Sequence, residues 1–585
     1  MEISGFNNKW VSTVASVWIQ CTSGSLYTFS IYSQTLKSTQ GYDQSTLDIV
    51  SVFKDIGVNC GVLAGFLYYY ATADGGGSRP WIVHLAGAIQ CFLGYFLMWA
   101  AVAGVFPRPP LPAMCFFMLV AAHAQSFFNT ANVVTGVRNF PSYSGTIVGI
   151  MKGFLGLSGA ILIQVYETIF NEQPTSFLLM LALLPTLNSL LFMWFVRIHN
   201  ADDEVDKKHL NSLSIVTLFL ATYLMLKIVL EHIFTFQFPL QVASFILLLI
   251  LLASPLYVAI RAQQRESRKI LHPSVTESDQ LISRSNQESE DFDNERRRES
   301  EESLNLFQAL YTIDFWILFF ATACGMGTGL ATVNNISQIG LSLGYTSLET
   351  TILVSLWSIW NFFGRLGAGY VSDYFLHAKG WARPLFMFIT LATMSIGHVV
   401  IASGLPGALF AGSVLVGVCY GSQWSLMPTI TSEIFGVVHM GTIFNAITIA
   451  SPVGSYIFSP LAYFSGEEVS TIKLFLEGCN THRVDKGVNT TYDIQSEIWR
   501  FSWSLLIRSQ HSSESEDSYL ESRIKIVSAN ICSARPSYTY AVVKQEPARM
   551  DDSYLAFWMT RNPLAHLIGD RVSVHQVQER GASIF

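Results

Sequence analysis

Thirteen apolar runs divide the chain, each long enough to cross a bilayer as a helix. A hydrocarbon core of about 30 Å requires about 20 apolar residues in helical conformation, with charges only near the ends. The pattern therefore predicts an all-α polytopic membrane protein. The runs cover residues 10–32, 47–71, 80–103, 112–135, 144–168, 176–197, 211–233, 238–260, 312–333, 348–372, 384–404, 407–428 and 441–463.

A weak internal repeat relates the first part of this pattern to the last part. At an offset of about 304 residues, Gly65 meets Gly369 and Arg79-Pro80 meets Arg383-Pro384. Parallel repeats of this kind are a known way to build secondary transporters. The offset spans eight helices, an even number, so both units share one orientation.

The repeat and the run lengths together predict five segments. Residues 1–200 form an N-terminal six-helix bundle, and residues 201–260 add two linking transmembrane helices. Residues 261–311 form a charged, disordered cytosolic loop. Residues 312–464 form a C-terminal bundle in which only five helices are visible, so its last helix is expected to be missing. Residues 465–585 are a polar, poorly ordered tail, which suggests an alternative or misread end of the coding sequence.

The composition agrees with a membrane protein and excludes several chemistries. Half of the residues are hydrophobic and 13% are charged, against about 25% charged in soluble proteins. The eight Cys residues include no CxxC pair, so neither a zinc site nor a disulfide framework is indicated. No phosphate-binding loop, metalloprotease motif or nucleophile elbow is present. We therefore expect no enzyme activity, no metal, no cofactor and no nucleic-acid partner.

Basic residues in the short loops predict the orientation. Most of them fall on one side if the N-terminus is cytosolic, as the positive-inside rule requires; they include Arg79, Arg138, Arg197, Lys379 and Arg383. This topology places the sequon at Asn335 on the non-cytosolic side, where it is a glycosylation candidate. We expect a monomer in the plasma membrane, with the bilayer and a small solute as partners.

The loop from Gly364 to Asp373, followed by Gly380 and Arg383-Pro384, resembles a signature of the major facilitator superfamily. The blocks Trp18 to Cys21, Gly24 to Asp48, Phe53 to Gly57 and Asn132 to Gly159 resemble its plant nodulin-like branch, the nuclear-fusion-defective type. The resemblance covers roughly residues 5–460. It implies a two-bundle transporter that works by rocking-type alternating access, with the substrate between the halves near the midplane.

The resemblance also implies a conformational latch, in which the loop aspartate contacts a neighbouring helix end and the loop arginines pair with acidic groups. Tyr69 occupies the position in the first copy that Asp373 occupies in the second, and Asp74 is a possible substitute. The implied latch residues are Gly65, Asp74, Arg79, Arg365, Gly369, Asp373 and Arg383.

Two glycine stripes mark faces where helices can approach closely. Gly57 and Gly61 continue to Gly65 in the second run, and Gly149, Gly153 and Gly156 continue to Gly159 in the fifth. Such stripes suit a seam between moving halves. Static packing within one bundle explains them equally well.

Lys54 and Asp55 are the charges most clearly inside an apolar run, and intramembrane charges are functional candidates by default. Lys54 could attract a carboxylate and Asp55 could take up a proton. The alternative is that Lys54 snorkels to the interface. Snorkelling also accounts for Lys152 and Glu167, which lie near opposite ends of the fifth run.

A polar stripe on the fourth run consists of Gln125, Asn129 and Asn132. Amides suit hydrogen bonding to a small polar solute in a wet cavity, although interhelical hydrogen bonding is an equally ordinary role. Gln423 lies in the matching helix of the second half. His123, beside the stripe, is a candidate proton carrier or a hydrogen-bonded structural residue.

These observations predict a secondary active transporter of a small organic solute, with a carboxylate and proton coupling as the specific expectation. Two alternatives remain. One is a transporter-like membrane sensor or receptor without flux, and the other is a truncated, non-functional isoform.

Overall fold

The computed structural model describes residues 8–73, 79–170, 174–199, 203–233, 238–271, 303–405 and 407–457. Within these residues the regular structure is helical. Ten of the helical segments are long and apolar enough to cross a membrane. The predicted all-α polytopic fold is confirmed.

The helices of the first part are α1 (Lys9–Ser23), the 3₁₀ turn η2 (Ser25–Thr28), α2 (Phe29–Gln40), α3 (Gln44–Asn59), α4 (Val62–Ala73), α5 (Trp81–Val102), α6 (Leu111–Asn139), η3 (Pro141–Tyr143), α7 (Ser144–Ile169), α8 (Pro174–Phe192) and η4 (Met193–Phe195). Two long helices follow, α9 (Asp203–Ile233) and α10 (Phe238–Leu271). The last part consists of α12 (Leu306–Leu310), α13 (Ile313–Ser342), α14 (Ser347–Lys379), α15 (Arg383–Ala402), α16 (Ala408–Phe435) and α17 (Met440–Thr448).

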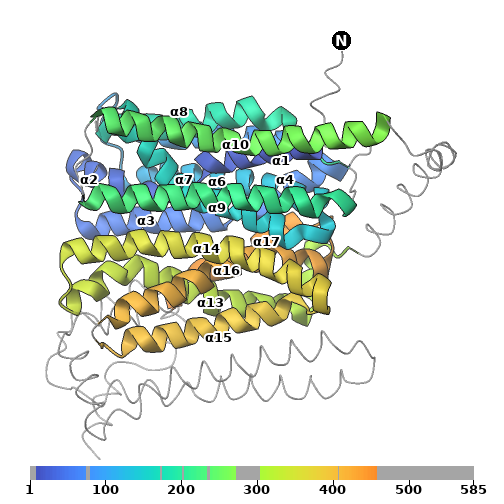
Figure 1. The fold of residues 1–585 in the computed structure, drawn as a ribbon. Helices are drawn as coiled ribbons and strands as arrows, with labels where there is room; N and C mark the ends of the chain where they lie inside the picture. The colour runs from blue at the N-terminus through green and yellow to red at the C-terminus, as the bar shows by residue number, and fades with distance from the viewer. Residues whose placement is uncertain are drawn as a thin grey trace, which may run out of the picture. The chain divides into compact units, whose positions relative to one another are not determined.

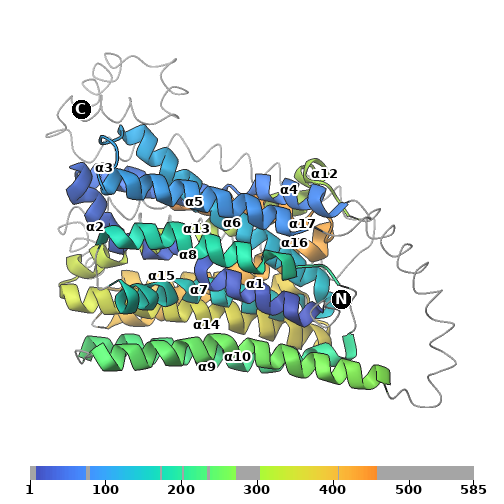
Figure 2. The ribbon, with the colours of Figure 1, turned by 90° about the horizontal axis from the view of Figure 1, so that it is seen from above.

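The long helices run nearly parallel to one another, with α13 to α17 packed together beside the helices of the first part (Figure 1). Helices α9 and α10 pack against each other along one flank (Figure 2). An ion pair of 3.3 Å between Lys227 Nζ and Glu167 Oε2 ties α9 to α7. The two linking helices therefore pack on the first half.

The first predicted run, 10–32, is not one continuous helix. It breaks at Gly24, continues as η2 and then extends as α2 to Gln40. Helix α1 approaches α7 closely here, because a Cβ on Gly24 would lie 2.7 Å from the Leu155 carbonyl oxygen. The Tyr27 N–H donates to the Gly24 carbonyl, and Tyr95 donates to Ser25. Broken helices of this kind suit a buried binding site in transporters.

The second predicted run is also interrupted, at Cys60 between α3 and α4. A His123 ring nitrogen lies 3.1 Å from the Cys60 carbonyl oxygen and satisfies it. A side chain inserted in this way is a common cause of a helix kink. At the start of α3, Asp43 accepts from the Thr46 N–H at 2.8 Å, and hydrogen bonds to Thr46 hold the pKa of the Asp43 carboxyl below its usual range.

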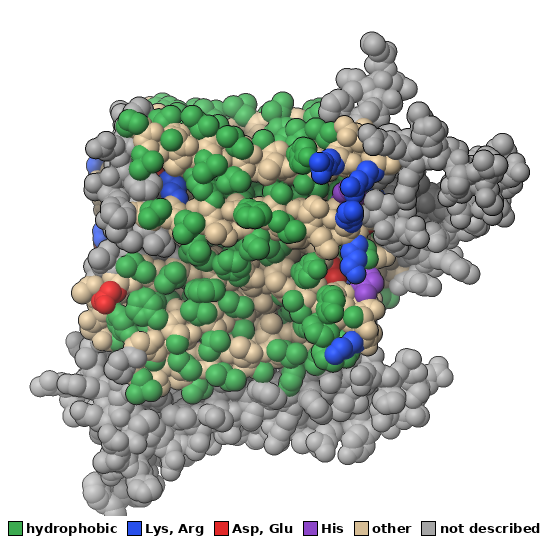
Figure 3. All heavy atoms as spheres, in the orientation of Figure 1, with side chains coloured by type: hydrophobic (Ala, Val, Ile, Leu, Met, Phe, Trp, Pro, Cys, Tyr) green, Lys and Arg blue, Asp and Glu red, His purple; other side chains and the backbone are tan. Residues whose placement is uncertain are grey.

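Basic side chains gather at one end of the helices, and hydrophobic side chains cover most of the rest of the face (Figure 3). We call this end the basic end. It is where α14 ends at Lys379 and α15 begins at Arg383. It also contains the start of α7, because the N–H groups of that first turn bond to α14 near its end.

The two repeat-related third helices differ in how much of each is covered. Half of the α5 span is buried, because α8 packs along it, whereas 22% of the α15 span is buried. Among the described residues no helix covers α15 as α8 covers α5. The predicted tail 465–585 lies outside the described residues, as does most of the loop 261–311.

Candidate functional site

The α7–α14 seam joins the two halves at the basic end, where the two helices run side by side (Figure 2). A Cβ on Gly149 would lie 2.9 Å from the Arg365 carbonyl oxygen, and a Cβ on Gly369 would lie 3.0 Å from Gly149 Cα. A Cβ on Gly153 would lie 3.1 Å from the Phe362 ring. The glycines of α7 therefore permit backbone-to-backbone contact between the halves.

Asp373 caps the first turn of α7 from across this seam. Its carboxylate accepts the Gly145 N–H at 3.0 Å and the Thr146 N–H at 2.6 Å. Arg383 donates to the same carboxylate at 2.5 Å and also pairs with Glu433. Asp373 and Arg383 are both nearly fully buried. A carboxylate at a helix N-terminus is stabilised by the helix dipole and by the unpaired N–H groups.

The α4–α17 seam is the repeat-related contact between the halves. Gly65 packs directly on the backbone of Gly441 and Thr442. Tyr69 lies where the second copy has Asp373, and its ring centroid is 4.3 Å from that of His439, the residue preceding α17. An aromatic contact therefore replaces the carboxylate cap.

Neutral hydrogen bonds complete the α4–α17 seam. Asn445 Nδ2 donates to Thr130 at 2.7 Å, and Thr448 donates to the Asn59 carbonyl at 3.1 Å. Asp74, the predicted substitute for the absent aspartate, lies outside the described residues. Arg79 is exposed, and its backbone N–H donates to the Ala71 carbonyl.

The stripe on the second helix serves two interfaces. Gly57 faces α6, because a Cβ there would lie 2.5 Å from the Leu119 carbonyl oxygen, whereas Gly61 faces Asn445 of α17 as well as Ser126. The sequence left two roles open for these glycines, packing within one bundle or packing at a seam between the halves. Gly57 packs within the first half, and Gly61 packs between the halves.

Arg365 lies inside α14 and is 1% exposed. Its guanidinium donates to Asn361 Oδ1 at 2.7 Å, to the Lys152 carbonyl at 2.9 Å and to the Tyr27 hydroxyl at 3.0 Å. The described residues contain no carboxylate within ion-pair distance of it. The expectation that Arg365 pairs with an acidic group is therefore wrong for these residues, whereas Arg383 does pair with two.

Lys152 is a buried cation, and the expectation that it snorkels to the interface is wrong. It lies two turns inside α7 and is 1% exposed. Its Nζ atom is 4.9 Å from the Trp424 ring centroid and 4.8 Å from that of Phe444. No described carboxylate forms an ion pair with it. Its position among small residues in a glycine-rich run was the sequence signal that could have identified it.

Both cations lie against the same ring, because Arg365 Cζ is 5.9 Å from the Trp424 centroid. The Trp424 Nε1–H is buried without an acceptor at hydrogen-bond geometry among the described residues. Ammonium, guanidinium and indole groups are all donors with no acceptor capacity. We call this set, with Tyr27, the cation cluster: Tyr27, Lys152, Arg365 and Trp424. It is formed by η2, α7, α14 and α16 and lies between the halves.

Lys54 and Asp55 are close to each other, with 3.3 Å between Nζ and Oδ1. Lys54 is buried and lies 5.1 Å from the Phe29 ring centroid. Burial, rather than snorkelling, is therefore the observed position of Lys54. The pair is neutral overall, so it provides no net charge for an anion.

In the predicted amide stripe, one side chain bonds to a neighbouring helix and two have side-chain oxygens without a hydrogen-bond partner among the described residues. Asn132 Oδ1 lies 2.9 Å from His84, and His123 lies 2.7 Å from Gln90 Oε1. The side-chain oxygens of Gln125 and Asn129 are buried without a partner among the described residues. Asn132 and His123 therefore hold helices together, and Gln125 and Asn129 retain free acceptors.

Gln423 and Asn335, two further sequence candidates, are not part of the cation cluster. Gln423 is fully buried, with its Nε2 atom 3.4 Å from Met394 Sδ and its Oε1 atom unpartnered. Asn335 lies within α13, half-buried, and donates to the Ala331 carbonyl at 2.7 Å. Glycosylation at Asn335 stays a prediction, although the sequon lies in a helix rather than in a loop.

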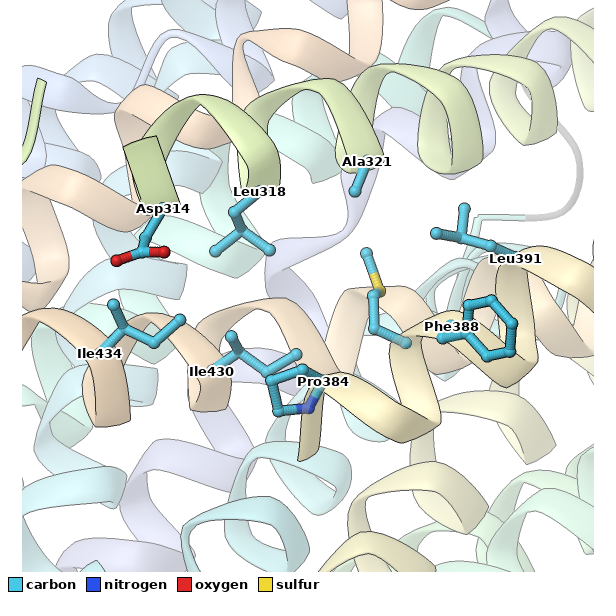
Figure 4. Close-up of a pocket in the computed structure, with 9 residues that line it drawn as sticks. Asp314, Leu318, Ala321, Pro384, Phe388, Leu391, Ile430 and Ile434 are labelled. Atoms are coloured by element: carbon cyan, nitrogen blue, oxygen red, sulfur yellow. The ribbon is translucent and has the colours of Figure 1, made fainter. Parts of the chain in front are cut away.

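A cavity in the second half lies away from the cation cluster, between α13, α15 and α16 (Figure 4). Its lining is apolar apart from Asp314 at one edge; the side chains are Asp314, Leu318, Ala321, Pro384, Met387, Phe388, Leu391, Ile430 and Ile434. This lining offers no arrangement of polar groups for a solute. Among the described residues, no group of His, Cys, Asp and Glu is arranged to hold a metal ion.

The chain matches two family models in sequence. Residues 9–260 match the nodulin-like model, and residues 301–473 match the model of the NFD4 C-terminal domain. The protein NUCLEAR FUSION DEFECTIVE 4 of Arabidopsis thaliana is 26% identical over 477 residues, covering 78% of this chain and 80% of the relative. The probable transporter MCH1 of Debaryomyces hansenii is 23% identical over 478 residues, covering 80% and 86%.

Solved structures share the fold. The proton:xylose symporter XylE bound to 6-bromo-6-deoxy-D-glucose matches with a TM-score of 0.50 and 12% identity, covering 86% of this chain and 97% of the symporter. A double tryptophan mutant of XylE matches with a TM-score of 0.51, also at 12% identity, covering 86% and 96%. At this identity the likeness concerns the fold alone. Together these matches show that the chain carries a nodulin-like domain followed by an NFD4 C-terminal domain, and that it has the fold of major facilitator superfamily transporters of known structure.

Proposed function

We propose that this protein moves a small organic carboxylate across a membrane by proton-coupled alternating access. The observation that carries the proposal is the cation cluster, in which Lys152 and Arg365 are buried between the halves without a carboxylate partner among the described residues. A transporter fold supplies the alternating access. The cluster supplies the preference for an anion.

The charge balance supports an anionic substrate. Near the middle of the described helices, the buried Lys54, Lys152 and Arg365 can carry positive charge, and the half-buried Asp55 beside Lys54 carries a negative charge. With Lys152 protonated, these four groups carry a formal charge of +2. Burying a charge without a partner is costly, so a bound carboxylate would stabilise this positive charge.

The donor geometry supports a carboxylate in particular. Three of the five N–H donors of the Arg365 guanidinium have acceptors among the described residues, on Asn361, Lys152 and Tyr27. The free donors, the Lys152 ammonium and the Trp424 Nε1–H therefore offer several hydrogen bonds to two carboxylate oxygens. Charge-assisted bonds of this kind are about twice as strong as neutral ones.

We propose that the two seams act as the gate at the basic end. Asp373, Arg383 and Arg365 with Gly369 form the latch of the α7–α14 seam, and Gly65 forms the contact of the α4–α17 seam. The basic end faces the cytosol in this proposal, with the N-terminus on the same side, because cytosolic loops are enriched in Lys and Arg. The plasma membrane remains the proposed location and a monomer the proposed state.

We assign secondary roles to the other sequence candidates. The Lys54–Asp55 pair tunes affinity rather than providing the principal charge, because its two members neutralise each other. Gln125 and Asn129 offer acceptors to hydroxyl groups of the solute, because their side-chain oxygens are unpartnered. His123 keeps α3 and α4 in their broken arrangement through Cys60.

Counterflow in proteoliposomes tests the proposed function. Purified full-length protein is reconstituted, loaded with unlabelled acetate, lactate, malate or citrate, and assayed for uptake of the same labelled acid. We expect at least one acid to show saturable counterflow that Lys152→Met lowers at least tenfold, whereas Lys208→Met, which changes an exposed lysine of α9, leaves it unchanged. Flux of xylose or choline in preference to every acid contradicts the proposal.

The same preparation distinguishes a transporter from a sensor. Binding of an acid by calorimetry without counterflow, in vesicles where a co-reconstituted transporter remains active, would favour the sensor. Flux without any dependence on Lys152 or Arg365 would keep the transporter and overturn the assignment of the site.

A further inference from the structure

We propose that Lys152 is the coupling residue of the transporter, binding and releasing a proton as the carboxylate binds and leaves. This inference rests on the proposed carboxylate transport and adds the group that carries the proton. Its basis is the position of Lys152 among aromatic rings and a second cation, with no carboxylate at ion-pair distance in the described part of the chain.

Within the described residues, no carboxylate lies at ion-pair distance from Lys152. Trp424 and Phe444 face its Nζ atom at 4.9 Å and 4.8 Å. Arg365, on α14, donates to the Lys152 carbonyl at 2.9 Å, lies against the same Trp424 ring and carries a permanent positive charge. Burial and a neighbouring like charge both disfavour the charged form of a lysine. In the proposed cycle, Lys152 is a neutral amine before the anion binds.

The described carboxylates near α7 do not relieve this situation: Glu167, Asp373 and Glu433 pair with other cations, and Glu349 caps α14 through Thr346. Glu167, at the far end of α7, pairs with Lys227 at 3.3 Å. Asp373, at the basic end, pairs with Arg383 at 2.5 Å. Other helices packed against α7 also carry titratable or charged side chains in the described part of the chain. These include Tyr27 of η2, Tyr420 of α16, Arg138 and His123 of α6, Arg261 of α10, and Asp206 of α9, which pairs with Lys9.

A bound carboxylate reverses the preference. An opposite charge within about 4–6 Å favours the charged form of an ionisable group. When a carboxylate enters beside Arg365, the Lys152 amine takes up one proton from the same side and becomes an ammonium that donates to the carboxylate. On the other side the carboxylate leaves, and the ammonium releases that proton. One proton and one negative charge cross together for a monocarboxylate, and no bond other than N–H forms or breaks.

Arg365 cannot take this role. A guanidinium keeps its proton throughout the physiological range, and Arg365 is held by Asn361, Tyr27 and the Lys152 carbonyl. The two cations therefore have different functions. Arg365 provides a fixed charge that attracts the anion, and Lys152 provides the charge that appears only with the anion.

Lys152→Arg separates proton coupling from anion binding. Full-length wild type and variant are placed in proteoliposomes containing a pH-sensitive dye, and the acid with the largest counterflow in the panel above is added outside. Protein-free vesicles give the leak of the undissociated acid, which is subtracted. We expect carrier-mediated acidification at about one proton per carboxylate in the wild type. In Lys152→Arg we expect counterflow within tenfold of the wild type but a tenfold or greater loss of proton movement.

The outcomes distinguish this inference from the proposed function. Wild-type carboxylate flux without proton movement, or Lys152→Arg with undiminished proton movement, overturns the inference and leaves carboxylate transport standing. No flux of any acid in the wild type overturns the proposed function and this inference with it. The wild type alone provides a further measurement. Calorimetric titration in two buffers of different ionisation enthalpy should show uptake of about one proton per bound carboxylate, and uptake of none contradicts the inference.

Discussion

The α7–α14 and α4–α17 seams occupy repeat-related positions but are closed by different chemistry. The first has a buried carboxylate on a helix N-terminus, held by Arg383, with Arg365 further along the same helix. The second has the Tyr69–His439 ring contact and the neutral hydrogen bonds of Asn445 and Thr448. In the proposed function, one seam therefore combines gate and site, whereas the other is mainly a packing contact.

The proposed gate and the proposed substrate site lie on the same helix, α14. Asp373 and Arg365 are eight residues apart, which is about 12 Å along a helix. Both bond to α7, at Gly145 and at Lys152 respectively. Separation of α7 from α14 would therefore break the cap and the bond from Arg365 to the Lys152 carbonyl in one movement.

Removing the carboxylate of the charged seam should have the largest effect. Asp373→Asn leaves Arg383 buried with only Glu433, and breaking a buried ion pair costs about 3 kcal/mol or more. We expect the first turn of α7, residues 144–149, to lose hydrogen-exchange protection at least tenfold in lipid nanodiscs. Tyr69→Phe, in the other seam, is the matched control and should leave this segment unchanged. Unaltered exchange in Asp373→Asn would show that the cap does not hold the seam.

Bulky residues at the two crossing glycines compare the packing of the seams directly. Gly369→Leu and Gly65→Leu each place a side chain against backbone, of Gly145 and of Gly441–Thr442 respectively. Overpacking typically costs about 1–3 kcal/mol. We expect both to open the basic end, measured as faster exchange of residues 144–149 and 440–445, and to lower counterflow. Gly367→Leu, where a Cβ meets nothing within 4 Å, is the control; an equal effect there would contradict the seam assignment.

Adding a carboxylate to the neutral seam should make the two seams more alike. Tyr69→Asp places an anion near the N-terminus of α17, close to His439. A carboxylate at a helix N-terminus contributes about 0.3–1 kcal/mol, so we expect two- to fivefold slower exchange in residues 440–445. Tyr69→Asn, with no charge, should not slow exchange. Slowing in both variants would attribute the effect to loss of the ring instead.

Acidification should weaken the α4–α17 seam only slightly. Burial, with the Arg138 charge as a smaller cause, holds the pKa of His439 below its usual value. An open seam that exposes His439 restores a pKa near 6.5, so the open state binds more protons. The contribution of His439 to the stability of the closed seam is therefore fully present above about pH 6.5 and is lost progressively as the pH falls below that value. Exchange of residues 440–445, corrected for intrinsic rates, should report this decline, and His439→Gln should remove it.

The sequence predicted the fold because long apolar runs leave few alternatives in a bilayer. It also nominated Asp373 and Arg383, because the repeat placed them in the better-preserved copy of the loop. The interruption at Gly24 was not predicted, since it depends on contact with Leu155 and Ser158 of another helix. Apolar composition is the same on either side of such a break.

The cation cluster was less accessible to sequence reasoning. Lys54 attracted attention as a charge inside a run, but its position beside Asp55 makes it part of a neutral pair. Lys152 looked terminal, because eight residues separate it from the start of α7. Its burial is a consequence of α14 and α16 covering that turn, and the residues that do so are more than 200 positions away.

Direct binding of a carboxylate tests the central claim that Lys152 and Arg365 form the substrate site. The transported acid is titrated by calorimetry into purified wild type, Lys152→Met and the control Lys208→Met. We predict that Lys152→Met raises the Kd at least a hundredfold, equivalent to about 2.7 kcal/mol, and that the control binds as the wild type does. Equal affinity in all three proteins, or tighter binding of a cation than of the acid, would contradict the account.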